Sequence, residues 1–316
     1  MPLVELESMV ARHVPGEGEP EIHRLSDGLV NETYRVLRGG RAYALRVAAT
    51  NFYDLGLDRA WEARVLERAA AADLAPVLEY CDPQRGILIA RWVDGRLWSP
   101  ADVRRQSNIA RVAELMRRIH GMPMPMPARA MSPAKWIEYY GAALTRPPQT
   151  WGARELSAAA ARRLAALAAL PGVNPVICHS DLHTLNMVDR GTSLVLLDWE
   201  YAHAADPLWD LAGWSANNDL EGNLSHDLLA SYTGRPPTHN EYLRLRLLGW
   251  LYDYVCLLWS ELYLSRHRNE PPGVDAPGLA DAPGVNAPLV GTSAANTWGG
   301  IAARARLLAA RLHASK

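Results

Sequence analysis

The chain has 316 residues, of which 49% are hydrophobic and 21% charged, and its formal net charge is -1. This composition is typical of a soluble globular protein with one large or two modest domains. A nearly neutral chain has no overall basic field for nucleic acid or an anionic membrane, so neither partner is expected.

The cysteines and the apolar segments predict a cytoplasmic protein. Cys81, Cys178 and Cys256 are far apart and form no CxxC pattern, which indicates free thiols in a reducing compartment. The N-terminus has no basic region before its apolar residues, so it does not resemble a signal peptide. Residues 247–259 are the most apolar later stretch, but they are too short to cross a bilayer and include Asp253, so no membrane insertion is expected.

The segment up to residue 92 predicts strands around one helix. A β-rich run ending near Leu37 and a second run over residues 43–47 flank the turn signal Gly39-Gly40. Asp58 is the expected N-cap of the helix that follows. After that helix, the runs VLEYC and ILIARWV on either side of the turn DPQRG predict a second hairpin.

Beyond Asp94-Gly95, which breaks the strand pattern, the sequence predicts mostly helices. Ser99-Pro100 is a good N-cap and N1 pair for a helix that ends at Gly121. The prolines of residues 122–127, MPMPMP, cannot continue that helix, so this segment is read as an extended connector. An alanine-rich helix is expected over about residues 156–170.

Two further helices are expected toward the C-terminal end. Thr238 and Glu241 form a capping box for a long helix that continues to about Arg268. Residues 271–297 repeat DAPG and have neither a helical nor a strand period, so they are read as a low-complexity loop. The last helix is expected over about residues 298–312.

The stretch CHSDLHTLNMV places several polar side chains between two apolar runs. His179 and His183 are four residues apart, which suits a zinc-binding helix, but the preceding VIC is strand-like and no further His/Cys cluster follows at zinc spacing. Asp181, Asn186 and Asp198 can also be turn-forming residues without a catalytic role. In phosphoryl transfer such residues supply a carboxylate near the acceptor hydroxyl and oxygen ligands that hold Mg²⁺ on the phosphates.

The order H-S-D-L-H-T-L-N and then L-L-D-W-E-Y resembles the aminoglycoside phosphotransferase and choline kinase superfamily, whose members are relatives of protein kinases. The form D-W-E-Y-A, with D-P-L-W-D-L-A behind it, is most similar to the choline, ethanolamine and bacterial thiamine kinase branch. The resemblance covers nearly the whole chain. It implies an α+β, two-lobe protein-kinase-like fold, with a small β-rich N-lobe over residues 1–92 and a larger, mostly helical C-lobe over residues 93–316.

Carried over residue by residue, the resemblance implies an enzyme that uses ATP and Mg²⁺. Asp181 would accept the proton of the substrate hydroxyl or orient that hydroxyl. Asn186, five residues later, and Asp198, in the DWEY segment, would hold Mg²⁺. These three residues follow the superfamily motif closely.

On the N-terminal side, the resemblance implies a nucleotide site. Arg46 stands where protein kinases have a lysine, and its guanidinium could pair with the phosphates while Glu62 fixes it. The backbone from Ala90 to Trp92 is where the adenine should hydrogen-bond. Gly28 and Asn31 belong to the nucleotide loop, which has one glycine where relatives often have two.

The aromatic composition bears on the acceptor. Eleven tryptophans and twelve tyrosines stand against one phenylalanine, and such rings attract organic cations by about 0.5 to 2 kcal/mol each. We therefore expect a small cationic alcohol such as choline, ethanolamine or thiamine, with these candidate contacts: Glu200, Tyr201, Trp259 and Glu261. The alternatives are an aminoglycoside or another small acceptor and, in a different class, a nucleotide-binding pseudokinase without turnover. Aromatic stripes also arise from core packing, and the sequence does not define an oligomeric state.

Overall fold

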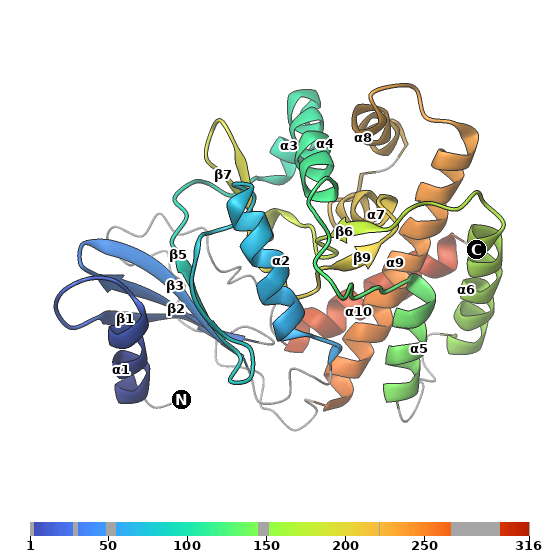
Figure 1. The fold of residues 1–316 in the computed structure, drawn as a ribbon. Coiled ribbons are helices and arrows are strands. Elements are labelled where there is room, and N and C mark those ends of the chain that lie inside the picture. Colours follow the sequence, from blue (N-terminus) through green and yellow to red (C-terminus); the bar gives the residue numbers. More distant parts are fainter. Residues whose placement is uncertain are drawn as a thin grey trace.

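The computed structural model has the predicted two-lobe fold, with an antiparallel sheet in the small N-lobe and a larger, mainly helical C-lobe (Figure 1). In the parts of the chain that the structure describes, no helix combines the length and the apolar character that a membrane span requires. The described residues are 3–27, 31–48, 55–144, 152–220, 222–266 and 298–315. The expected low-complexity loop, residues 271–297, lies outside these ranges.

The N-lobe is built on a five-stranded sheet in the order β1-β2-β3-β5-β4. Both predicted hairpins are present, because β2 pairs with β3 and β4 pairs with β5, each in antiparallel register. Gly39 and Gly40 both have positive φ, 54° and 70°, which is the backbone that a two-residue hairpin turn requires. The strands are β1 (Glu21–Asp27), β2 (Asn31–Arg38), β3 (Arg41–Ala48), β4 (Leu78–Asp82) and β5 (Ile87–Arg91).

The alternation along β3 separates the lobe's core from its functional face. Tyr43, Leu45 and Val47 are buried in a core shared with α1 (Leu3–His13), a helix that the sequence reading did not predict. Because successive side chains of a strand point to opposite faces, Arg46 lies on the other side of the sheet. That side meets α2 (Arg59–Ala71), which is capped by the Asp58 carboxylate as predicted.

The helix predicted from Ser99 to Gly121 is in fact two helices, α3 (Pro100–Val103) and α4 (Gln106–His120). Ser99 and Asp102 form a reciprocal capping box, and Arg105 then adopts an extended backbone with φ -71° and ψ 129°. Asp102 is held in addition by Arg96, whose Nη1 donates to its Oδ2 at 2.8 Å. The prediction of one continuous helix is wrong. It considered only the spacing of residues along the helix, whereas Asp102 is also held by Arg96, which lies before the helix begins.

The C-lobe is organised around α9 (His239–Arg266), whose start is fixed by the predicted capping box of Thr238 and Glu241. Four helices pack against α9, and α10 crosses it in Figure 1. They are α5 (Pro133–Ala143), α6 (Ala153–Ala168), α7 (Leu208–Asn217) and α10 (Trp298–Ala314). The alanine-rich α6 and the terminal α10 confirm two predicted helices, whereas α5 and α8 (Asn223–Thr233) were not predicted.

The segment from residue 176 to residue 205 contains four short strands, which form two separate two-stranded sheets. β6 (Val176–Cys178) pairs with β9 (His203–Ala205), and β7 (Met187–Asp189) pairs with β8 (Leu194–Leu196). A single 3₁₀ turn, η3 (Thr184–Asn186), leads into β7. The HSDLHTLN motif therefore spans the loop from β6 to β7, and the DWEY motif directly follows β8.

Candidate active site between the lobes

The loop after β6 is fixed from the C-lobe by α7. The Asp210 carboxylate accepts hydrogen bonds from the backbone N–H groups of His179 at 2.9 Å and Ser180 at 2.7 Å. The buried His179 ring lies 2.9 Å from the Leu197 carbonyl oxygen through its Nε2 atom. Ser180 has a φ of 70°, which turns the chain sharply before Asp181. The loop that carries Asp181 is thus held by buried polar contacts on both sides.

Asp181, Asn186 and Asp198 line one cavity of about 540 Å³ between the lobes. The Asn186 amide nitrogen donates to the Asp181 main-chain oxygen and to its carboxylate, both at 3.1 Å. With its nitrogen used in this way, Asn186 retains its carbonyl oxygen for another partner. The three residues that the motifs predicted as a functional set are therefore brought to one site.

His183 lowers the pKa of the Asp181 carboxyl. Burial by itself raises the pKa of the Asp181 carboxyl, but the charge of His183 and a hydrogen bond from it lower the pKa below its usual range. The two groups are 3.5 Å apart, between Nε2 and Oδ2. Asp181 is therefore held as a carboxylate, the form that can accept a proton or orient a hydroxyl.

Arg46 joins the N-lobe to the DWEY segment. Its guanidinium pairs with Glu62 of α2 at 2.5 Å, as the sequence predicted, and with Asp198 at 2.7 Å. The Arg46 and Glu62 side chains are only 12% and 3% exposed, so this contact is screened little by solvent. Arg46 thus touches the residue expected to hold the metal.

A second arginine, which the sequence reading missed, completes this cluster. Arg59 lies 2.9 Å from both Glu62 and Glu200, and it donates to the Asn31 side-chain oxygen at 2.7 Å. Asn31 in turn donates to Glu200 at 2.8 Å. Arg59 precedes Glu62 by three residues on α2, and residues at this spacing are neighbours on a helix. This spacing was the one sign of the contact in the sequence. Asn31 and Glu200 are here parts of a buried ionic cluster.

The surroundings of the Asp198 carboxyl disfavour its ionised form. Burial, helped by the nearby Glu200 carboxylate and opposed by Arg46, raises the pKa of Asp198 to about 8. A divalent cation would favour the ionised form, since a bound cation dominates the local charge. Asp198 and the Asn186 carbonyl supply the oxygen ligands that Mg²⁺ prefers. The residues present therefore fit a magnesium ion.

The adenine side of the site differs in detail from the expectation. The backbone N–H of Trp92 donates to the Ala42 carbonyl at 3.0 Å, and that of Arg91 donates to the Val77 carbonyl at 2.8 Å. An adenine contact through the Trp92 N–H would have to replace this bond. The roles of Ala90 and Trp92 stay predictions, and Gly28 lies outside the described residues.

Aromatic side chains of the C-lobe line the part of the cavity where the acceptor is expected. Tyr201 and Trp259 are joined by a hydrogen bond of 2.7 Å from the indole nitrogen to the tyrosine hydroxyl. Trp259 also stacks on Tyr263, with ring centroids 5.5 Å apart. Six tryptophan and tyrosine residues line the cavity: Trp136, Tyr140, Tyr201, Trp209, Tyr252 and Trp259.

The charge on the acceptor side is not the one expected. Glu261 is not among the described residues that line the cavity, because a position two residues from Trp259 is rotated by about 200° around the helix. Arg304 and Arg311 of α10 line the cavity instead. The sequence reading missed both, since only the tertiary fold brings α10 to this site.

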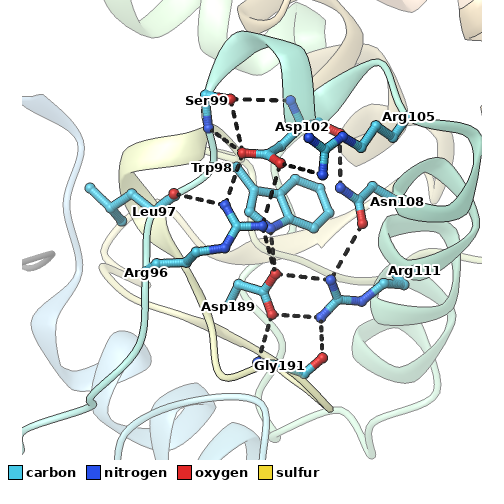
Figure 2. Close-up of polar contacts among 10 residues, drawn as sticks. All are labelled: Arg96, Leu97, Trp98, Ser99, Asp102, Arg105, Asn108, Arg111, Asp189 and Gly191. Atoms are coloured by element: carbon cyan, nitrogen blue, oxygen red, sulfur yellow. Dashed lines mark hydrogen bonds and ion pairs between the residues drawn. The ribbon is translucent and has the colours of Figure 1, made fainter.

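A polar brace connects the linker between the lobes, residues 92–99, with the β7–β8 hairpin that follows Asn186 (Figure 2). Asp189, at the end of β7, accepts hydrogen bonds from the Trp98 indole at 2.7 Å and from Arg111 at 2.7 and 2.9 Å. Arg96 exchanges two backbone hydrogen bonds with Asp189, at 3.0 and 2.9 Å. The linker and the β7–β8 hairpin are therefore held to each other by buried polar contacts.

A β-rich lobe and a helical lobe that bring an HxDxxxxN loop and a following aspartate into one cavity define a kinase-like phosphotransferase. The chain belongs to the phosphotransferase enzyme family (APH), whose family profile matches residues 21–248. The resemblance predicted a phosphotransferase, and the family match agrees with this prediction.

Solved structures extend this comparison over the whole chain. A choline/ethanolamine kinase family protein from Mesorhizobium loti is 25% identical, with a TM-score of 0.72 over 99% of this chain and 94% of that one. Choline kinase LicA from Streptococcus pneumoniae is 18% identical, with a TM-score of 0.71 over 98% of both chains. APH(2")-IIia, solved with GDP and kanamycin, is 14% identical, with a TM-score of 0.65 over 99% of both. The last two likenesses show the fold alone.

The sequence match to a curated relative is shorter. Protein LicA from Haemophilus influenzae is 26% identical over 91 residues. These residues are 27% of this chain and 34% of that protein, so the match spans about a third of the relative's length.

Proposed function

We propose that the protein transfers the γ-phosphoryl group of Mg-ATP to the hydroxyl of a small organic alcohol that carries a positive charge. The proposal rests on one observation: Asp181, Asn186 and Asp198 line the same cavity, and Arg46 reaches this cavity from the N-lobe. The cavity is lined both by N-lobe residues, among them Arg46, and by aromatic residues of the C-lobe. It therefore offers polar groups for a nucleotide and aromatic faces for an acceptor within reach of the same carboxylate.

The chain's own residues divide the reaction between them. Asp181 orients the acceptor hydroxyl and takes its proton as the oxygen attacks the γ-phosphorus. The bond between the γ-phosphorus and the bridging oxygen breaks, and ADP leaves. Arg46 provides positive charge for the phosphates, and Asp198 and Asn186 would hold Mg²⁺, which when bound neutralises charge on the transferred group.

The aromatic walls support an organic cation as part of the acceptor. Tyr201 and Trp259 hold each other in place through their hydrogen bond, so their faces are preorganised. Such faces replace part of the water shell of an ammonium group, and each ring attracts the cation by about 0.5 to 2 kcal/mol. Choline, ethanolamine and thiamine are the probes that fit this description.

An ADP-release assay tests the proposal. Wild-type protein with Mg-ATP is offered choline, ethanolamine, thiamine and several aminoglycosides, and release with at least one cationic alcohol is expected. The control is Asp198→Ala, which should lose Mg²⁺-dependent turnover because the metal loses a carboxylate ligand. Nucleotide binding without ADP release under any alcohol would instead favour a pseudokinase.

A further inference from the structure

Arg304 places a positive charge on the acceptor side of the cavity. It lies on α10 and lines the cavity together with Tyr252 and Cys256. Its guanidinium donates to the Asn217 side-chain oxygen at 3.1 Å, and the side chain is exposed to solvent. A ligand in the cavity can therefore reach it.

Arg304 differs from Arg311, the other arginine that α10 contributes to the cavity. Arg311 is neutralised from two sides, by Asp219 at 3.1 Å and by Asp253. For Arg304, no carboxylate of the described residues lies within ion-pair distance. Since a guanidinium stays protonated throughout the physiological range, Arg304 keeps its positive charge in the cavity.

This charge is difficult to reconcile with an acceptor that is only a cation. Glu261, the expected balancing carboxylate, does not line the described cavity. Asp181 and Asp198 do line it, but the proposed reaction uses them for the hydroxyl and the metal, and Arg304 would repel an ammonium group near it. One carboxylate on the acceptor removes the conflict, because a guanidinium binds a carboxylate through two parallel hydrogen bonds. A phosphate dianion fits less well, since the other arginine of α10 is already paired.

We propose that the acceptor is a zwitterionic hydroxy compound of the amino-acid or betaine type. Its ammonium group lies against the aromatic walls around Trp259, its carboxylate binds Arg304, and its hydroxyl faces Asp181. This inference rests on the proposed function, and Arg304 is its specificity-determining residue.

Pairs of alcohols that differ by a carboxylate or a carboxymethyl group test the inference. Serine is compared with ethanolamine, and carnitine with choline, by kcat/KM in the ADP-release assay. In the wild type the carboxylate member of at least one pair should be favoured by roughly 10- to 100-fold, as expected for a charge-assisted bidentate contact. Arg304→Met should bring this ratio close to one. Arg306→Met, two residues along the same helix and away from the cavity, should retain the wild-type ratio.

The outcomes separate this inference from the proposed function. Turnover of choline or ethanolamine with no preference for the carboxylate members overturns the inference and leaves the proposed function intact. A wild-type preference that Arg304→Met does not change also overturns it. If no alcohol supports turnover, the proposed function fails, and binding decides the inference. Tryptophan fluorescence then compares the Kd values of each pair, and equal or unmeasurable affinities overturn it.

Discussion

Asp189 is the carboxylate on which the brace between the linker and the β7–β8 hairpin depends (Figure 2). Its side chain is 5% exposed and accepts four hydrogen bonds, from Trp98, twice from Arg111, and from the Gly191 N–H at 2.8 Å. Asp189→Asn keeps the shape of the side chain, but it turns an amide N–H₂ toward donors and removes the charge. We expect this substitution to destabilise the protein strongly.

The structure sets the size of the effect. Removing one partner of a buried ion pair costs about 3 to 5 kcal/mol. Arg111 remains 29% exposed and can regain some hydration, so the lower end, about 3 kcal/mol, is expected. Urea unfolding measures the loss. The matched control is Asp73→Asn, whose partner Arg190 is 3.5 Å away in an exposed pair, and which should change the unfolding free energy by under about 1 kcal/mol. Equal stability of Asp189→Asn and wild type would refute the reasoning.

The same brace predicts a pH dependence. The hydrogen bond from Arg111, together with those from Trp98 and Gly191, lowers the pKa of Asp189 from 3.8 to about 2 although burial opposes this. A depressed pKa contributes stability that is fully present above about pH 4 and is lost as the pH falls toward 2, by roughly 2 kcal/mol. The stability difference between wild type and Asp189→Asn should therefore shrink over this window. A difference that stays constant from pH 5 to pH 2.5 would contradict the assignment.

Three further substitutions test other parts of the site. Arg59→Met leaves the buried carboxylates of Glu62 and Glu200 without one of their cations, so a loss of about 3 kcal/mol is expected in thermal unfolding; unchanged stability would argue against the ionic cluster. Ser180→Gly should be more stable than Ser180→Ala by about 1 kcal/mol, because φ is 70° at this position and glycine adopts such a backbone without strain. The reverse order of stability would contradict a positive φ at residue 180. Trp259→Leu should raise the acceptor KM by roughly 3- to 30-fold at a nearly constant KM for ATP, and equal weakening of both would mean that Trp259 is only a core residue.

The sequence was most informative where function and local pattern coincide. Asp181, Asn186 and Asp198 could be placed together because their spacing and flanking strands form one contiguous motif. The capping residues Asp58 and Thr238 were predicted correctly, since capping depends on neighbours three residues away.

What could not be predicted depends on contacts between distant segments. Arg59 meets Glu200 across 141 residues, and Arg304 reaches the cavity from a helix that follows the low-complexity segment. The break between α3 and α4 arises where Asp102 is held by Arg96 of the linker, outside the helical period. Glu261 does not line the described cavity, and the sequence did contain the reason. Two residues along a helix from Trp259, its side chain points to a different face.

The central claim is that Asp181 serves the transfer step of a Mg-ATP-dependent phosphotransferase, and single-turnover transfer of a labelled γ-phosphoryl group tests it most directly. Wild type and Asp181→Asn are saturated with labelled Mg-ATP and an acceptor identified in the ADP-release screen, and formation of the phosphorylated alcohol is followed over time. Asp181→Asn should bind Mg-ATP with a nearly unchanged Kd and transfer the phosphoryl group about 10² times more slowly or worse. Transfer at the wild-type rate by a folded Asp181→Asn protein would contradict the account.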